Sequence, residues 1–302
     1  DSYLPTKSGI VTVVIQLKKI LEEFGHHVVV VTVSASEYET EAERDPSVLR
    51  VLSIHSPVGT GQYIGIPHKK KVVEFLKAHQ IQIIHAHTEF FVGHMSVVAG
   101  KELGIPVVAT THTMWEDYYR YYLVMGYLIP RRMIRKIVKN LYRRFYALIN
   151  VSQKAHRYFT KPFMLPNIPS AIIPNAIDSK KFAACSCTEE DKMQLRTELG
   201  IAEDDRVILY VGRVVEEKRV IELLEIIKRV VHARECIKMV FVGSGFAEVE
   251  LREAVNELGL NQKILFTGFI DWNKLALYYA IGDMFVTVSL SEMHSMTVLE
   301  AM

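Results

Sequence analysis

Residues 284–302 read MFVTVSLSEMHSMTVLEAM: an apolar, β-branched run, a polar loop and an apolar segment with helical spacing. A strand that passes through a loop into a helix points the first helix amides at whatever binds there, and such an end favours phosphate. Glu292 stands in the loop, and Glu300 follows about two turns later at ~3.6 residues per turn. Two such carboxylates could accept hydrogen bonds from vicinal hydroxyls while the amides hold a diphosphate. Alternatively, Glu292 caps the helix and Glu300 is solvated.

Strand and helix patterns alternate along the whole chain, which predicts βαβ units and parallel sheets. At 302 residues the chain suggests two domains of ~150 residues each. Prolines at 162, 166 and 169 predict a linker over residues 161–170, and hence domains of residues 1–170 and 171–302. Expected strands are residues 28–33, 48–54, 81–85, 107–111 and 147–151, then 207–211, 239–242, 264–267 and 284–288. Expected helices are residues 10–24, 69–79, 92–103, 131–145 and 153–159, then 217–231, 248–258 and 273–280.

The net charge of +2 divides unevenly along the chain. Residues 1–178 hold 21 Lys and Arg against 14 Asp and Glu, whereas residues 179–302 hold 15 against 20. A basic first part beside an acidic second part indicates an anionic partner for the first part only, unless the sorting is chance. No nucleic-acid recognition motif accompanies the charge, so nucleic acid is not an expected partner.

Three cysteines are too few for a disulfide framework and lack the spacing of a zinc site, which favours a reducing cytosol. No apolar run approaches the ~18 residues that span a bilayer, so we expect any membrane contact to be peripheral. The helical segment 131–145 has many cations, a large apolar face and no acid, a pattern typical of membrane-surface helices. An ordinary core-facing helix with a solvated basic side is the alternative. The expected membrane-binding residues are Arg131, Arg132, Arg135, Lys136 and Lys139.

Several segments resemble motifs of the retaining glycosyltransferases of family four, which have the GT-B fold. The Glu292-x7-Glu300 segment resembles the family's Glu-x7-Glu motif, and a glycine loop, a Pro-Asn-Gly-Ile-Asp-like motif and an Arg/Lys pair precede it in the expected order. Residues 111–118, THTMWEDY, resemble the diacylglycerol glucosyltransferase branch in particular. The other matching segments are Pro5-Thr6-Lys7-Ser8-Gly9, Ile84-His85-Ala86-His87-Thr88, Pro174-Asn175-Ala176-Ile177-Asp178, Val211-Gly212-Arg213, Glu217-Lys218, Val242-Gly243-Ser244-Gly245 and Thr267-Gly268-Phe269-Ile270.

The resemblance implies two Rossmann-like, doubly wound α/β domains that face each other across a cleft. It also implies chain ends trimmed on both sides, with the first strand and the last elements missing. Ligands of open parallel sheets bind at the carboxyl ends of the strands. A guanidinium and an ammonium can neutralise a diphosphate leaving group, so the site needs no divalent metal and no cofactor. The implied catalytic residues are His112, Glu292, Arg213 and Lys218, and the implied donor-binding residues are Gly9, Gly243, Ile270, Met296, Thr297 and Glu300.

The sequence thus predicts a retaining hexosyltransferase that moves glucose from UDP-glucose to a membrane lipid such as diacylglycerol. We expect it in the cytoplasm, peripherally associated with the cytoplasmic face of an anionic membrane. One alternative keeps the chemistry but uses a soluble sugar or small-molecule acceptor. Another is a non-catalytic fragment that binds nucleotide or membrane.

Overall fold

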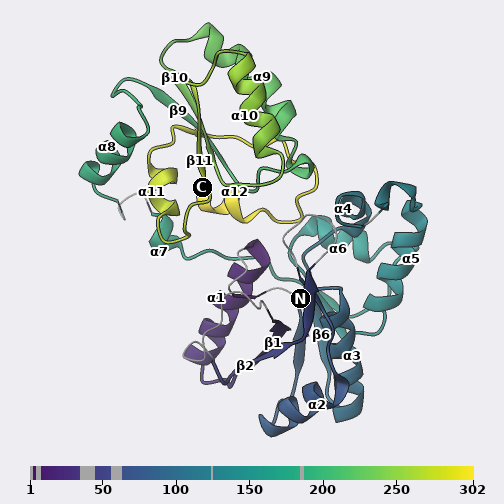
Figure 1. The fold of residues 1–302 in the computed structure, drawn as a ribbon. Coiled ribbons are helices and arrows are strands. Elements are labelled where there is room, and N and C mark those ends of the chain that lie inside the picture. The colour runs from purple at the N-terminus through teal and green to yellow at the C-terminus, as the bar shows by residue number, and fades with distance from the viewer. Residues whose placement is uncertain (1–2, 5–7, 35–44, 56–62, 124, 184–186) are drawn as a thin grey trace. The chain divides into compact units, whose positions relative to one another are not determined.

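The computed structural model describes residues 3–4, 8–34, 45–55, 63–123, 125–183 and 187–302. The chain forms two compact units, Asp1–Asn175 and Ala176–Met302, and each is an α/β arrangement with parallel strands (Figure 1). Parallel sheets in two units agree with the predicted fold class. The division comes five residues after the predicted boundary at residue 170.

The first unit begins with α1 (Gly9–Glu23), which the spacing of apolar residues predicted. The hydroxyl of Ser8 caps its first turn by accepting from the amide of Val11 at 3.3 Å. Gly25 adopts φ +85° just beyond its end, the left-handed geometry expected of a glycine cap. The other helices of this unit are α2 (Lys69–Ala78), α3 (Phe91–Leu103), α4 (Trp115–Tyr122), α5 (Arg131–Tyr142) and α6 (Gln153–Phe159), with a 3₁₀ turn, η2 (Gly126–Leu128).

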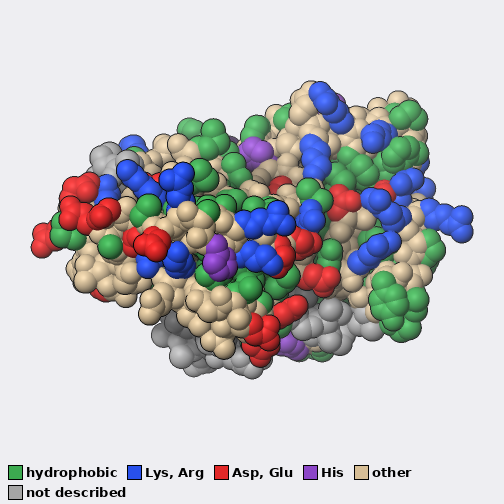
Figure 2. Space-filling model, turned by 90° about the horizontal axis from the view of Figure 1, so that it is seen from above, with side chains coloured by type: hydrophobic (Ala, Val, Ile, Leu, Met, Phe, Trp, Pro, Cys, Tyr) green, Lys and Arg blue, Asp and Glu red, His purple; other side chains and the backbone are tan. Residues whose placement is uncertain are grey.

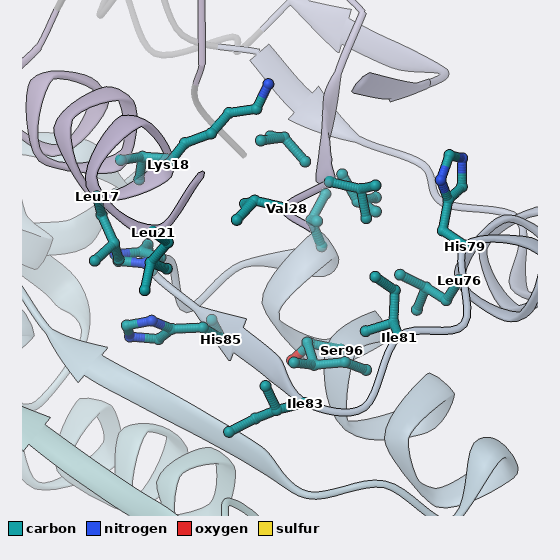
Figure 3. A pocket seen from close by; sticks show the side chains of 18 of the residues that line it. Leu17, Lys18, Leu21, Val28, Leu76, His79, Ile81, Ile83, His85 and Ser96 are labelled. Atoms are coloured by element: carbon teal, nitrogen blue, oxygen red, sulfur yellow. The ribbon is translucent and has the colours of Figure 1, made fainter. Parts of the chain in front are cut away.

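The strands of the first unit form three separate ladders within the described residues. β5 (Ile84–Ala86), β6 (Val107–Thr111), β7 (Ala147–Asn150) and β8 (Ser170–Ile172) are parallel and adjacent in that order. β1 (Val30–Val33) pairs in parallel with β2 (Val48–Val51). An apolar pocket lies between β1 and β5, lined by side chains such as Leu21, Val28 and Ile83 (Figure 3).

Two sequence predictions fail in this unit for packing reasons. Residues 48–54 form two strands instead of one, because β3 (Ser53–His55) leaves β2 after the exposed Leu52 and pairs antiparallel with β4 (Tyr63–Gly65). Residues 161–170 are not a linker between the units. Met164 and Leu165 are buried there, and β8 completes the first sheet. The prolines exclude helix but do not prevent packing.

The second unit is a four-stranded parallel sheet of order β11-β10-β9-β12, with helices on both faces. α9 and α10 pack on one face, and α8 and α11 on the other (Figure 1). The strands are β9 (Arg206–Val211), β10 (Ile237–Val242), β11 (Ile264–Gly268) and β12 (Met284–Phe285). The helices are α7 (Ser179–Phe182), α8 (Glu189–Glu198), α9 (Val220–Ala233), α10 (Glu248–Glu257), α11 (Leu275–Ala280) and α12 (Met296–Ala301), with a 3₁₀ turn, η4 (Glu216–Lys218).

The predicted helix over residues 217–231 is interrupted near its start. Residues 216–218 form η4, and α9 begins only at Val220 because Arg219 adopts the left-handed conformation at φ +58°. A left-handed residue cannot continue a right-handed helix. The break places Glu217 and Lys218 in the loop that follows β9 instead of on α9.

Candidate functional site

The loop after β9 carries Arg213 and Lys218, the two cations that the sequence assigned to a diphosphate. Lys218 Nζ lies 2.5 Å from Glu292 Oε1, although the two residues are 74 positions apart. Three of the four predicted catalytic residues are therefore brought together in the second unit. The side chain of Arg213 is 46 % exposed and that of Lys218 only 16 %.

Sequence reasoning assigned no role to Glu217, whose side chain contacts both cations. One carboxylate oxygen lies 3.3 Å from Arg213 Nη2, and the other lies 3.3 Å from Lys218 Nζ. Only 2 % of this side chain is exposed. A buried charge needs partners of opposite sign, and these two cations supply them. The signal in the sequence was a carboxylate four residues after one cation and next to the other.

Gly243 follows β10 at the same end of the sheet, at φ +132°. A Cβ built there would lie 2.0 Å from the carbonyl oxygen of Gly212. Contact between these two loops is therefore enough to require glycine at position 243. Its predicted role in binding a donor stays a prediction.

The three predicted donor-binding residues of the last segment, Met296, Thr297 and Glu300, lie on α12. Glu300 is buried, and Tyr279 donates to its Oε2 at 2.9 Å. Burial raises the pKa of the Glu300 carboxyl. Met296 and Thr297 begin α12, and Ser295 at the cap position makes no side-chain hydrogen bond to their amides. The predicted contacts of these amides with a diphosphate stay untested.

The remaining donor-binding predictions concern backbone positions. Ile270 follows β11, and its side chain packs against the core cluster of Val211, Val240 and Val242. Gly9 is the first residue of α1 in the first unit, beside the capping Ser8. Pro5, Thr6 and Lys7 of the predicted glycine loop lie outside the described residues. Among the described residues, no contact of Ile270 or Gly9 tests the predicted role of either in donor binding.

Three histidines cluster where β5 and β6 end in the first unit. His87 Nδ1 lies 3.0 Å from His112 Nε2, and the rings of His85 and His87 are 4.1 Å apart. His85 Nε2 lies 2.6 Å from the hydroxyl oxygen of Thr110. Burial lowers the pKa of His85 to about 4 and that of His112, with a further effect of His85, to about 3. Both imidazoles are therefore uncharged at neutral pH. Sequence reasoning gave a role to His112 alone.

A protonatable carboxyl lies close in the sequence to this cluster. Tyr142 donates to Glu89 Oε1 at 2.5 Å. Burial raises the pKa of Glu89 to about 7, against the effect of that hydrogen bond. Sequence reasoning missed Glu89, because a single glutamate before an apolar helix gives no chemical signal.

The basic helix α5 is anchored to α4 by ion pairs. Glu116 of α4 accepts two hydrogen bonds from Arg135, at 2.6 and 2.8 Å, and a third from Tyr158. Arg131 donates to Asp117 at 2.9 Å. Glu116 has a side chain only 3 % exposed, so this pairing is part of the fold. Lys139 of α5 also donates to the carbonyl of Phe163 at 2.9 Å.

Of the five predicted membrane-binding residues, Arg132, Lys136 and Lys139 have no ion pair within the described part of the chain, and of these only Lys139 donates to a carbonyl, that of Phe163. Arg132 and Lys136 share an exposed face of α5 with Met133 and Ile137, which are 54 % and 52 % exposed. Tyr127 and Leu128 of η2 are also exposed, a few residues before α5 in the sequence. Lys and Arg side chains gather with hydrophobic ones on the right-hand side of Figure 2, the side on which α4 and α5 lie in Figure 1.

Among the described residues, no helix is long and apolar enough to cross a membrane. The same residues contain no group of three His, Cys, Asp or Glu side chains placed to hold a metal ion.

Comparison with known proteins shows the class to which this fold and site belong. Residues 7–181 match the family described as Glycosyltransferase Family 4, and residues 191–302 match the family described as Glycosyl transferases group 1. The structure resembles that of Anabaena Alr3699/HepE in complex with UDP and glucose, with a TM-score of 0.74 and 19 % identity over 99 % of this chain and 76 % of that one. The chain therefore belongs to glycosyltransferase family 4 and has the GT-B fold, as the sequence predicted.

Within this family, the chain is similar to two proteins with the same name. It is 29 % identical to the alpha-monoglucosyldiacylglycerol synthase of Streptococcus pneumoniae, over 100 % of this chain and 67 % of that protein. It is also 29 % identical to the alpha-monoglucosyldiacylglycerol synthase of Acholeplasma laidlawii, over 100 % of this chain and 76 % of that protein. The branch expected from residues 111–118 is confirmed.

Proposed function

We propose that this glycosyltransferase moves glucose from UDP-glucose to a membrane lipid such as diacylglycerol, with retention of configuration. The observation that carries the proposal is the contact of Lys218 with Glu292 beside Arg213. A sugar nucleotide presents a diphosphate next to sugar hydroxyls. The cations suit the diphosphate, and the carboxylate suits the hydroxyls. The names of the relatives in Streptococcus and Acholeplasma support the choice of sugar and lipid.

The charged residues have separate roles in the proposed reaction. Negative charge develops on the departing diphosphate, and Arg213 and Lys218 stabilise it most strongly in the transition state. Glu292 accepts from hydroxyls of the sugar, and Glu300 accepts from hydroxyls of the ribose. Gly9, Gly243, Ile270, Met296 and Thr297 keep their predicted roles as backbone contacts to the donor.

His112 contributes as an uncharged group in this proposal. Its low pKa means that it neither attracts the diphosphate nor requires a counter-ion at neutral pH. It can therefore hydrogen-bond a sugar or acceptor hydroxyl and position it near the reacting centre.

The proposed reaction needs no divalent metal, because two cations already face the leaving group. Turnover is expected to be unchanged in the presence of a strong chelator. Loss of turnover with the chelator, followed by recovery with one specific divalent ion, would contradict this part of the proposal.

A lipid acceptor requires the protein to meet a membrane surface. The exposed face of α5, which we define as Arg132, Met133, Lys136 and Ile137, combines apolar side chains with cations. This combination is typical of elements that lie at an anionic headgroup boundary. The proposal places the protein on the cytoplasmic face of the membrane, as a peripheral protein.

Mass spectrometry of the products tests the function directly. The protein is incubated with a panel of nucleotide sugars and vesicles that contain diacylglycerol, and proton NMR of the product gives the anomeric configuration. We expect a single hexosyl diacylglycerol of α configuration, from UDP-glucose. Transfer only to soluble acceptors would show that the acceptor is not a lipid. Nucleotide binding without any product would indicate a non-catalytic protein.

A further inference from the structure

Glu217 is the most buried of the four charged side chains around the proposed diphosphate site. Its side chain is 2 % exposed, against 16 % for Lys218 and 31 % for Glu292. A residue so enclosed is poorly placed to contact substrate itself. Its carboxylate instead reaches Arg213 on one side and Lys218 on the other.

The backbone around Glu217 is held on both sides. Tyr210 donates to the carbonyl of Arg213 at 2.7 Å, which fixes the loop where it leaves β9. On the other side, the left-handed Arg219 ends η4 and turns the chain into α9. The carboxylate is therefore a fixed point between two cations that sit on long, otherwise adaptable side chains.

The charge of Glu217 has two opposing effects on a phosphate site. A negative charge beside the cations weakens their attraction for a diphosphate. The same charge restricts where a guanidinium and an ammonium can lie, and orientation matters more for the reaction than for binding. A residue that acts by orientation should therefore affect turnover and nucleotide affinity in different ways.

We propose that Glu217 is a positioning residue that holds Arg213 and Lys218 in the arrangement needed by the departing diphosphate. This inference rests on the proposed function of the same site. It adds a role for a residue that touches neither the sugar nor the nucleotide.

The test compares Glu217→Gln with Glu216→Gln. Glu216 precedes it in the same 3₁₀ turn but is exposed, so both variants lose one negative charge from η4. Turnover is measured with UDP-glucose and diacylglycerol vesicles, and UDP affinity by calorimetry. For Glu217→Gln we expect kcat to fall about ten- to a hundredfold while UDP binds as tightly as to the wild type or more tightly. Glu216→Gln should match the wild type in both.

A second variant keeps the test decisive if Glu217→Gln does not fold. Glu217→Asp retains the charge but withdraws the carboxylate by one methylene. We again expect kcat to fall while UDP affinity is kept, with a smaller loss of kcat than in Glu217→Gln. Wild-type turnover in the folded Glu217 variants, or a loss of UDP affinity as large as the loss of kcat, would overturn the proposal. The proposed function fails separately, if the wild type itself neither binds UDP nor forms a glycolipid.

Discussion

The carboxyl ends of the parallel strands carry neutral side chains in the first unit and charged ones in the second. His85 and His112 are uncharged at neutral pH because burial lowers the pKa of each well below its usual value. In the second unit, Arg213, Lys218 and two glutamates alternate in sign. The first arrangement suits hydrogen bonding to hydroxyls, and the second suits an anionic leaving group. The strand ends of the two units thus differ in the kind of group they can bind.

The largest effect is expected from breaking the charged arrangement. Arg213→Ala and Lys218→Ala should each reduce turnover about 10²- to 10³-fold, or ~2.7–4 kcal/mol, because each removes a preorganised charge from the leaving diphosphate. Steady-state kinetics with UDP-glucose measure the effect, and thermal unfolding checks that the fold is retained.

Arg206→Ala is the matched control for these two variants. Arg206 begins β9 and pairs with Asp283 at 2.8 Å, but its side chain is 74 % exposed. Because Arg206 is the first residue of β9, it lies at the opposite end of that strand from Arg213. Turnover close to the wild-type rate in Arg213→Ala and Lys218→Ala, as in this control, would remove both cations from the proposed mechanism.

The neutral arrangement predicts a loss of stability in acid. An unfolded histidine takes up a proton below about pH 6.5, whereas folded His85 does so only near pH 4. Its contribution is thus present above pH 6.5 and lost as the pH falls to about 4. A pKa lowered from 6.5 to about 4 corresponds to roughly 3 kcal/mol. Urea unfolding of wild type and His85→Gln, measured from pH 7.5 to pH 4, should show a shallower loss in the variant.

Glu89 acts in the opposite direction over part of the same range. Because its folded pKa is raised to about 7, it stabilises the fold as the pH falls from about 7 to 4.5. The wild-type profile alone therefore combines both effects, and the difference between the two proteins isolates His85. His68→Gln, at an exposed position, is the control. If the free energy of unfolding fell equally steeply with pH in His85→Gln and in the wild type, His85 would not be held neutral in the fold.

In the first unit, Glu116 joins α4 to α5 through its ion pair with Arg135. Glu116→Gln should destabilise the protein by about 1–3 kcal/mol, because it leaves the partly buried Arg135 without a charged acceptor. Asp117→Asn is the matched variant one residue on. It breaks the pair with the 55 % exposed Arg131, so its cost should be below about 1 kcal/mol. Equal free energies of unfolding for the two variants would contradict a structural role specific to Glu116.

The two units also differ in how far their sequences revealed the site. In the second unit, residues 284–302 and the resemblance around Arg213 predicted Arg213, Lys218 and Glu292, which the structure brings together. Glu217 was missed because its role depends on burial, which the sequence pattern does not show. In the first unit, the linker prediction failed since proline reports on backbone geometry and not on the packing of Met164 and Leu165.

Helix α5 also shows what the sequence could not predict. The sequence correctly predicted an amphipathic helix from residue 131, with the apolar Ile134, Val138 and Leu141 buried. It could not divide the cations into those that pair within the fold and those that face solvent. The acceptors Glu116 and Asp117 lie on a different helix, so the division arises only from the tertiary contact of α4 with α5.

The smallest effect is expected at the exposed face of α5. The double variant Arg132→Gln/Lys136→Gln should weaken binding to anionic vesicles by about 1 kcal/mol for each charge removed. Added salt should weaken wild-type binding as well, since the Debye length falls from ~10 Å at 0.1 M to ~3 Å at 1 M. Binding to neutral vesicles should change little, because only Met133 and Ile137 then contribute. Vesicle co-sedimentation at two salt concentrations measures all three effects.

Arg143→Gln/Arg144→Gln provides a control with the same change in net charge. Both arginines are exposed just beyond the end of α5, six and seven residues after Ile137. If the exposed face of α5 meets the membrane, this control should bind anionic vesicles more tightly than the Arg132 and Lys136 variant. An equal loss in the two double variants would mean that overall charge, and not this face, attracts the protein to the membrane. Wild-type binding by both would assign α5 to core packing alone, and the lipid acceptor would then have to be reached by another surface.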